Sequence, residues 1–268
     1  MNRKSAIGTR KSNGALGQAI SLDPSTLDVR TIALACGSGA IVMVTAIVLI
    51  PVGIITFFRA RRLYSAFARL ACQAILRIYG ITVRVHQTAS FPKTQTIYIS
   101  NHTSTLDLFV LVSLGLPNCR FFLSGFLKKI LPLGVISGMM GTFFTVPQDR
   151  PAERTRIFQR AERILRRTGE SVYLSPEGAR ITTGLIGHFN KGAFHLATNL
   201  RAPIVPFFIA IPPGMDPGRG IAARPGVIDV QVMTAIDTRS WTLADLERNK
   251  ERVRDQFVTM HAEKRHAA

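Results

Sequence analysis

The segment Thr96-Ile-Tyr-Ile-Ser-Asn-His-Thr-Ser-Thr-Leu-Asp107 carries the clearest structural signal in the chain. Its first five residues, Thr96–Ser100, are apolar or β-branched at most positions and have the length of a strand. A helical stretch follows at about Ser104–Leu114. A strand that passes almost directly into a helix is the repeating unit of α/β folds.

The same alternation continues on both sides of this segment. Further strands are expected at Thr82–His86, Thr142–Val146, Ser171–Leu174, Ile204–Ala210 and Val227–Met233, and further helices at Pro151–Thr168 and about Leu243–His261. This order predicts an α/β fold with a mostly parallel sheet flanked by helices. We therefore expect one catalytic domain over residues 81–268.

The N-terminal part of the chain has a different character. Residues 1–30 are basic and rich in Ser, Gly and Asn, which predicts a flexible tail and not a signal peptide. Thr31–Phe58 contains no charged residue and would be about 42 Å long as a helix, whereas the hydrocarbon core is about 30 Å thick. Pro51 lies inside this run, so a kinked span and a re-entrant hairpin are both open, with a buried helix of a soluble fold as the third interpretation.

A basic amphipathic helix is expected next, over Arg61–Tyr79. Its pattern fits a helix lying on anionic lipid, and it also fits an ordinary surface helix packed on a core. We take residues 31–80 together as a membrane-associating helix or helix pair. Basic residues gather after the apolar run: Arg59, Arg61, Arg62, Arg69 and Arg77. The positive-inside rule then places the catalytic domain on the cytoplasmic side of the membrane.

Composition limits the possible partners. The 268 residues carry a formal net charge of +18, which attracts anionic lipid, nucleic acid or phosphorylated substrates. No recognition module with interleaved basic and aromatic residues is visible, so we expect no nucleic-acid partner. The three cysteines, Cys36, Cys72 and Cys119, lack CxxC spacing, and no metal site is expected.

Chemistry-bearing residues follow the predicted strands. His102 comes directly after Ser100 and Asn101, where a histidine can act as a general base and Asp107 can orient its ring. The two side chains meet only if His102 lies in a non-helical turn, because five residues of helix place them on different faces. The alternative is a surface histidine near a helix cap.

Two more turns follow strands. Leu174-Ser-Pro-Glu-Gly-Ala-Arg180 is a rigid turn that presents Glu177 and Arg180 for gripping a polar substrate, although Pro-Glu-Gly is also common in ordinary surface turns. Arg150 precedes Pro151 and is expected at a helix cap, where free N–H groups and the helix dipole attract phosphate. A solvated surface arginine is the competing interpretation.

These blocks, in this order, resemble the glycerophospholipid acyltransferase family over roughly residues 81–210. His102 to Asp107 resembles its His-x4-Asp motif, Phe143 to Arg150 its second block, Pro176 to Arg180 its Pro-Glu-Gly-Thr-Arg block, and Ala202 to Pro206 its fourth. Two departures are visible: Thr-Val-Pro-Gln intervenes before Asp149 in the second block, and Ala179 replaces a threonine in the third.

The resemblance implies transfer of a fatty acyl group from acyl-CoA or acyl carrier protein to a lysophospholipid. The expected acceptor is 1-acyl-glycerol-3-phosphate, which would give phosphatidic acid. His102 would be the general base and Asp107 its orienting partner. Arg150, Glu177, Gly178 and Arg180 would bind the acceptor, and no cofactor is implied. An acyltransferase for another lyso-lipid, such as an ornithine-type or remodelling substrate, and a non-catalytic membrane scaffold remain alternatives. A serine hydrolase would need a GxSxG segment, and this sequence contains none.

Overall fold

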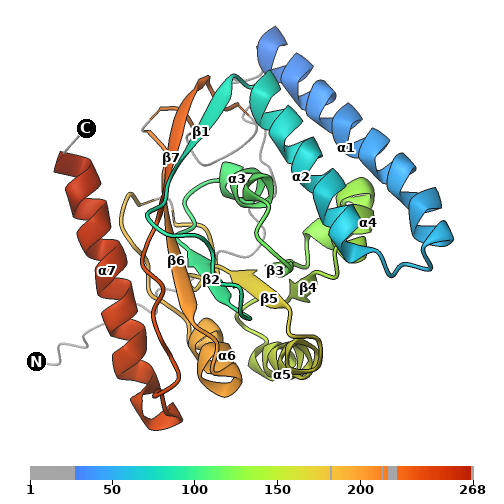
Figure 1. Ribbon diagram of the computed structural model, residues 1–268. Helices are drawn as coiled ribbons and strands as arrows, with labels where there is room; N and C mark the ends of the chain where they lie inside the picture. Colours follow the sequence, from blue (N-terminus) through green and yellow to red (C-terminus); the bar gives the residue numbers. More distant parts are fainter. Residues whose placement is uncertain (1–27, 182, 213, 217–221, 267–268) are drawn as a thin grey trace, which may run out of the picture.

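The computed structural model describes residues 28–181, 183–212, 214–216 and 222–266, and Figure 1 shows their arrangement. A seven-stranded sheet with the order β1-β7-β6-β2-β5-β3-β4 forms its centre. The strands are β1 (Ile81–His86), β2 (Ile97–Ser100), β3 (Cys119–Ser124), β4 (Phe143–Thr145), β5 (Ser171–Leu174), β6 (Ile204–Ala210) and β7 (Gly226–Val232).

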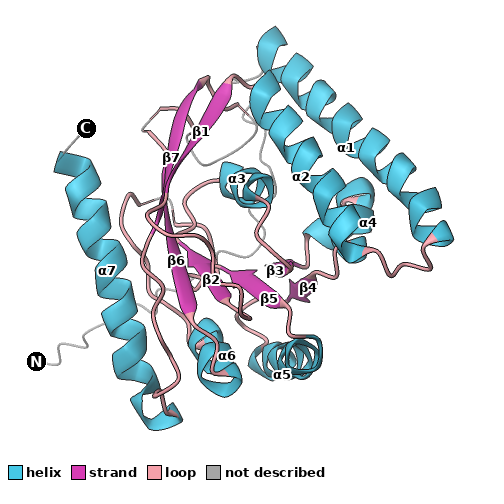
Figure 2. Cartoon of the chain, in the orientation of Figure 1, coloured by secondary structure: helices cyan, strands magenta, loops and turns pink. Residues whose placement is uncertain are grey.

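The sheet is mixed but mostly parallel. Strands β2 to β6 all run in one direction, whereas β7 pairs antiparallel with β6 and parallel with β1. Helices cover both faces of the sheet (Figure 2), so the predicted α/β class is confirmed. The helices are α1 (Val29–Ile55), α2 (Arg61–Ile78), α3 (Leu106–Leu114), α4 (Leu131–Met139), α5 (Pro151–Thr168), α6 (Gly192–Leu200) and α7 (Leu246–His266), with short 3₁₀ turns η2 (Leu127–Lys129) and η3 (Leu243–Asp245).

Strand β2 shows how alternation builds two hydrophobic cores. Tyr98 joins the core under α1, α2, α3 and α4, whereas Ile97 and Ile99 join the core under α5, α6 and α7. Successive side chains of a strand point to opposite faces, so one strand contributes to both cores. All four residues of β2 are buried, and so are all four of β5, as expected for strands covered on both sides.

The apolar N-terminal run forms one helix and not a hairpin. Pro51 lies within α1, and the chain turns back after it at Phe57 and Phe58, both with positive φ. Helices α1 and α2 then pack side by side (Figure 1), so the predicted helix pair is present. By length and composition α1 is the one helix among the described residues that could cross a membrane, and most of its apolar window is not buried.

The flexible tail predicted for residues 1–30 lies almost wholly outside the described residues. The described part of the chain begins with Asp28, whose carboxylate accepts a hydrogen bond from Thr31 N at 2.7 Å and caps α1. The Thr31 side chain and its backbone N–H together lower the pKa of Asp28. The backbone hydrogen bond also satisfies an N–H group that the helix leaves free at its start.

Candidate active site

The three predicted turns lie at the same edge of the sheet. His102 follows β2, Glu177 and Arg180 follow β5, and Arg150 follows β4. These strands run in the same direction, with β3 between β4 and β5, so their carboxyl ends share one edge. This is the edge at which α/β proteins build their sites.

His102 and Asp107 contact each other directly. His102 Nδ1 lies 2.9 Å from Asp107 Oδ2, and the histidine sits in the non-helical turn before α3. The Asp107 side chain is 1% exposed, whereas that of His102 is 34% exposed. A carboxylate can only accept, so Nδ1 carries the hydrogen of the neutral ring and Nε2 keeps a free lone pair. The condition for a contact between His102 and Asp107 is therefore met, and the hydrogen bond to Asp107 favours the tautomer with its hydrogen on Nδ1.

Asp107 is itself held in place by the turn that precedes it. Its Oδ2 also accepts hydrogen bonds from Thr103 N at 2.8 Å and Ser104 N at 2.9 Å. Charge-assisted hydrogen bonds of this kind fix a carboxylate more firmly than neutral ones. The turn, the carboxylate and the imidazole thus form one rigid unit.

Glu177 holds the backbone of His102 from the neighbouring strand end. Its Oε2 accepts from His102 N at 2.6 Å, and its Oε1 accepts from Gly187 N at 2.7 Å. Ile181 N donates to His102 O at 2.8 Å. Burial raises the pKa of Glu177, against the lowering effect of the two N–H donors. The predicted role of Glu177 was substrate binding, and the structure adds a direct contact that fixes the position of His102.

Gly178 is required by the shape of the same turn. Its φ is +68°, and a Cβ there would lie 2.7 Å from Asn190 Nδ2 and 3.0 Å from Gln148 Nε2. Asn190 Nδ2 donates to the carbonyls of Pro176 and Glu177, both at 3.0 Å. The closeness of Gln148 shows that the loop after β4 lies against the Pro-Glu-Gly turn.

Arg150 and Arg180 are the two cations of these loops. Arg150 occupies the N-cap of α5 as predicted, is 63% exposed, and has Nη1 3.5 Å from Glu153. Arg180 is half-buried and precedes Ile181, whose N–H bonds His102. Both arginines are thus carried by loops that meet beside His102, and binding of substrate phosphate by them remains a prediction.

Two residues that sequence reasoning missed also support this edge. Asn101 is buried, and its amide exchanges two hydrogen bonds with the backbone of Ile209, at 2.9 and 2.8 Å, which fastens the turn to β6. Arg254 of α7 donates to Gly187 O at 2.8 Å and to Ile186 O at 3.1 Å. Gly187 in turn donates to Glu177, so α7 supports the histidine turn indirectly, although it covers the opposite face of the sheet from α3.

Two apolar spaces lie on the side of α1 to α4. A small cavity of about 50 Å³ lies between α2, α3, α4 and β3, and Leu108, which follows Asp107 in the chain, is one of the residues that line it. A larger groove of about 440 Å³ is lined by Ile54, Arg61 and Gly141 among others. Gly141 precedes β4, so this groove reaches the amino-terminal end of the strands and not the histidine turn. Among the described residues, no cluster of His, Cys, Asp or Glu is arranged to hold a metal ion.

Comparison with known proteins agrees with this geometry. Residues 82–210 match the acyltransferase family profile, close to the range of the predicted resemblance. Curated relatives include the 1-acyl-sn-glycerol-3-phosphate acyltransferase of Saccharomyces cerevisiae, 29% identical over 71% of this chain and 63% of that protein. The BAT2 enzyme of the same name from Brassica napus is 32% identical over 65% of this chain and 50% of its own length. The human alpha enzyme of that name is 27% identical over 73% of this chain and 69% of its own.

A solved structure shows the same fold. The 1-acyl-sn-glycerophosphate acyltransferase of Thermotoga maritima superposes with a TM-score of 0.67 over 87% of this chain and 97% of that one, at 18% identity. The matched range contains the histidine turn, the loop before α5 and the Pro-Glu-Gly turn. Residues 82–210 therefore form an acyltransferase-family domain, similar to the corresponding part of these 1-acyl-sn-glycerol-3-phosphate acyltransferases.

Proposed function

We propose that this protein transfers a fatty acyl group from a thioester to the free hydroxyl of 1-acyl-glycerol-3-phosphate. One observation carries the proposal: His102 is partly exposed, bonded through Nδ1 to a buried Asp107, and located at the strand edge inside the family's matched range. The relatives described above are named for this acceptor, which supports the choice of substrate.

The chemistry follows from the free lone pair on Nε2. His102 takes the proton of the acceptor hydroxyl, and the oxygen of that hydroxyl attacks the carbonyl carbon of the thioester. The new C–O bond forms, the C–S bond breaks, and the proton passes from His102 to the leaving thiolate. Asp107 stabilises the imidazolium that exists between these two transfers. General-base assistance of this kind contributes about 10²–10⁴ in rate, and no covalent acyl-enzyme is needed.

The acceptor phosphate needs cations beside the histidine. Arg150 and Arg180 lie on the two loops that border it, and the start of α5 offers free N–H groups. We assign the phosphate to these two side chains. Glu177 and Gly178 shape the turn that carries Arg180, so their contribution to acceptor binding is through its position.

The membrane is the proposed source of the acceptor. Helix α1 exposes large apolar side chains along its length, among them Ile47, Ile50 and Ile54, and Phe57 and Phe58 are exposed at the following turn. An exposed apolar surface of this extent is typical of a lipid contact. We propose that α1 and α2 anchor the domain in the membrane, with the domain on the cytoplasmic side.

The test is an acyl-transfer assay with detergent-solubilised protein. Radiolabelled acyl-CoA and acyl carrier protein would each be offered with 1-acyl-glycerol-3-phosphate and with a panel of other lyso-lipids. The proposal predicts phosphatidic acid as the main product. Product from a different acceptor alone would replace the substrate assignment, and no product from any pair of donor and acceptor would favour the scaffold interpretation.

A further inference from the structure

Helix α5 carries a stripe of arginines that the proposed reaction does not use. Arg156, Arg160, Arg163 and Arg167 recur at intervals of four, three and four residues, so they share one face of the helix over about 16 Å. We call these four residues the arginine stripe. All four are exposed.

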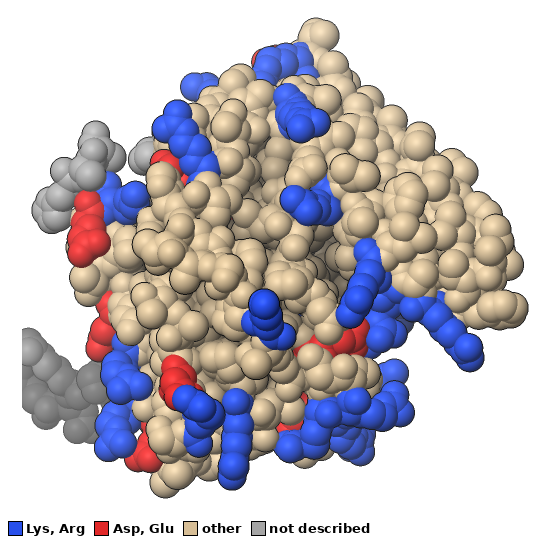
Figure 3. All heavy atoms as spheres, viewed as in Figure 1, with Lys and Arg blue, Asp and Glu red and all other residues tan. Residues whose placement is uncertain are grey.

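The arginine stripe has no acidic partner among the residues that the structure describes. Glu153 pairs with Arg150 and Glu162 pairs with Arg166, whereas none of the four stripe residues has an ion pair in the part of the chain that the structure describes. Like charges three and four residues apart destabilise a helix. The repulsion within the stripe destabilises α5, which favours a role for the stripe in binding a partner. Figure 3 shows the resulting cluster of basic side chains over α5.

A lipid bilayer fits this stripe poorly. Helix α5 packs on the hydrophobic core of α6 and α7, on the opposite face of the sheet from α1 and its exposed apolar side chains (Figure 1). No large hydrophobic residue of α5 is among the exposed ones, because Phe158 and Leu165 contact the sheet side. Helices that lie in a membrane surface bury an apolar face in the lipid, whereas the apolar face of α5 packs against the core of the domain.

A nucleotide fits less well than a protein. The phosphates of a nucleotide are gripped by donors that converge on one point, whereas the arginine stripe is straight and extended. Carboxylates spaced along a helix of an acidic protein match such a stripe, and complementary charge of this kind guides association. The helix begins at Pro151, beside the loop that contacts the Pro-Glu-Gly turn, so a partner docked on α5 lies near the site.

We propose that the arginine stripe docks an acidic acyl carrier protein, which presents the acyl thioester to His102. This inference rests on the proposed function and identifies the donor that the family resemblance leaves open. The carrier would contact the stripe while its thioester-bearing arm reaches the sheet edge. The reaction at the thioester is unchanged: the C–S bond breaks and the carrier leaves as the free thiol.

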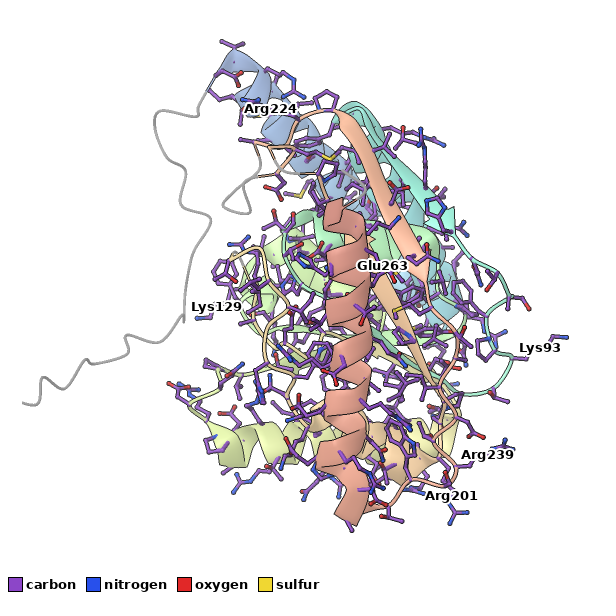
Figure 4. The ribbon with its side chains drawn as sticks, turned by 90° about the vertical axis from the view of Figure 1, so that its left-hand side faces the viewer. Lys93, Lys129, Arg201, Arg224, Arg239 and Glu263 are labelled. Carbon is purple, nitrogen blue, oxygen red and sulfur yellow. The ribbon has the colours of Figure 1, made fainter. Side chains whose placement is uncertain are left out.

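The experiment compares two triple variants of the full-length protein. The stripe variant is Arg156→Gln, Arg160→Gln and Arg163→Gln, since glutamine has a helix propensity similar to that of arginine. The control variant is Arg84→Gln, Lys93→Gln and Arg252→Gln, which removes the same charge from exposed positions outside α5. Figure 4 shows Lys93 at the edge of the molecule away from α5.

Three quantities are measured for the parent and both variants. They are the Kd for fluorescently labelled palmitoyl-loaded acyl carrier protein, the KM for that donor and for palmitoyl-CoA, and the partition into vesicles containing anionic lipid. The stripe variant is expected to raise the Kd and the KM for the carrier protein about tenfold, because exposed charge pairs each contribute little. The KM for palmitoyl-CoA and the vesicle partition should change less than twofold, and the control variant should match the parent.

Three results would overturn the docking proposal. An equal rise in KM for both donors would mean that the stripe serves the nucleotide, and a loss of vesicle binding alone would mean that it serves lipid. An unchanged Kd for the carrier protein in the stripe variant would exclude docking there. The Kd needs no turnover, so the docking proposal remains testable even if the acyl-transfer assay finds no product.

Discussion

Helices α1 and α5 are both exposed at the surface, on opposite faces of the same sheet, and they expose opposite chemistry. The segment of α1 from Thr31 onward has no charged residue, and many of its apolar side chains are exposed. Helix α5 carries six arginines, and its apolar residues are turned to the core. The sheet therefore separates the exposed apolar surface of α1 from the basic surface of α5. The histidine turn lies at the carboxyl-terminal edge of the sheet, between these two surfaces. We relate this difference to the two partners proposed above, a membrane at α1 and an acyl carrier protein at α5.

The largest effect on catalysis is expected at the histidine turn, which lies on neither of these two surfaces. Asp107→Asn should lower kcat about 10³-fold, because the imidazolium loses its charged partner and the tautomer of His102 is no longer fixed. Binding to vesicles and to acyl carrier protein should match the parent. Steady-state kinetics with both donors, with vesicle sedimentation as the second readout, checks this. A variant that retains a tenth of the parent kcat would show that the pair is not the centre.

A second substitution removes the ion pairs through which Glu170 links helix α2 to strand β3. Glu170 accepts from Arg61 of α2 at 2.9 Å and from Arg120 of β3 at 2.7 Å. Glu170→Gln should lower the free energy of unfolding by about 3 kcal/mol, since it leaves the largely buried Arg120 without its charged partner. Denaturant unfolding in detergent measures this. As a control, Glu153→Gln, which removes an exposed partner of Arg150, should change stability by less than 1 kcal/mol.

The same carboxyl predicts how stability depends on pH. Burial alone would raise the pKa of Glu170, but the hydrogen bond and charge of Arg120, with help from Thr168 and Arg61, lower it overall. A carboxyl with a lowered pKa stabilises the fold above its unfolded pKa and loses this contribution as pH falls through the folded value. Unfolding curves between pH 7 and pH 3 should therefore show an acid-dependent loss that is smaller in Glu170→Gln. Parallel curves for the two proteins would contradict this.

The lipid surface is tested by polar substitutions on α1. Ile47 and Ile54 are 59% and 61% exposed, and the double change Ile47→Ser and Ile54→Ser should reduce partition into neutral vesicles by tenfold or more, at about 25 cal/mol per Å² of apolar area lost from the contact. The effect should be insensitive to salt. Leu185→Ser, at an exposed position outside α1, serves as the control. If the control lost as much binding as the double variant, the contrast between α1 and the rest of the surface would fail.

The smallest effect is expected at Glu177, whose carboxylate accepts hydrogen bonds from the backbone of His102 and Gly187. Glu177→Gln replaces one acceptor oxygen by an NH₂ group, so either His102 N or Gly187 N loses its acceptor. We expect kcat to fall about tenfold with little change in KM for either donor. Glu177→Ala should be worse, because both N–H groups then lack a partner. A rise in KM without a fall in kcat would instead assign Glu177 directly to the acceptor.

Much of the fold could be predicted because its signals are local. The largely apolar runs Thr96–Ser100 and Ile204–Ala210 and the proline at Pro151 located strands and a helix within a few residues of those observed. Strand β3 and helices α4 and α6 were not among the predicted elements. The segment of β3 carries a polar residue, Arg120, whose burial is explained by its pairing with Glu170. That pairing spans 50 residues of chain, so no local pattern announces it.

The site divides in the same way. The contact of His102 with Asp107 could be predicted only on the condition that His102 lies in a non-helical turn, and the structure meets this condition. The hold of Glu177 on His102 joins residues 75 apart, and the support from Arg254 joins α7 to the loop at Gly187. These contacts depend on strand order and helix packing, which a single sequence does not reveal. Sequence therefore located the candidate residues, and the structure was needed to find which contacts position them.

The most direct test of the account is the acyl-transfer rate of the His102→Ala variant beside the parent. We expect kcat to fall at least about 10³-fold with acyl-CoA and with acyl carrier protein as donor. The variant should keep the parent's melting temperature, vesicle partition and affinity for the carrier protein, since His102 belongs to neither surface. A folded variant that transfers acyl groups at a rate close to that of the parent would contradict the account, because no other base is bonded to a buried carboxylate at this edge among the described residues.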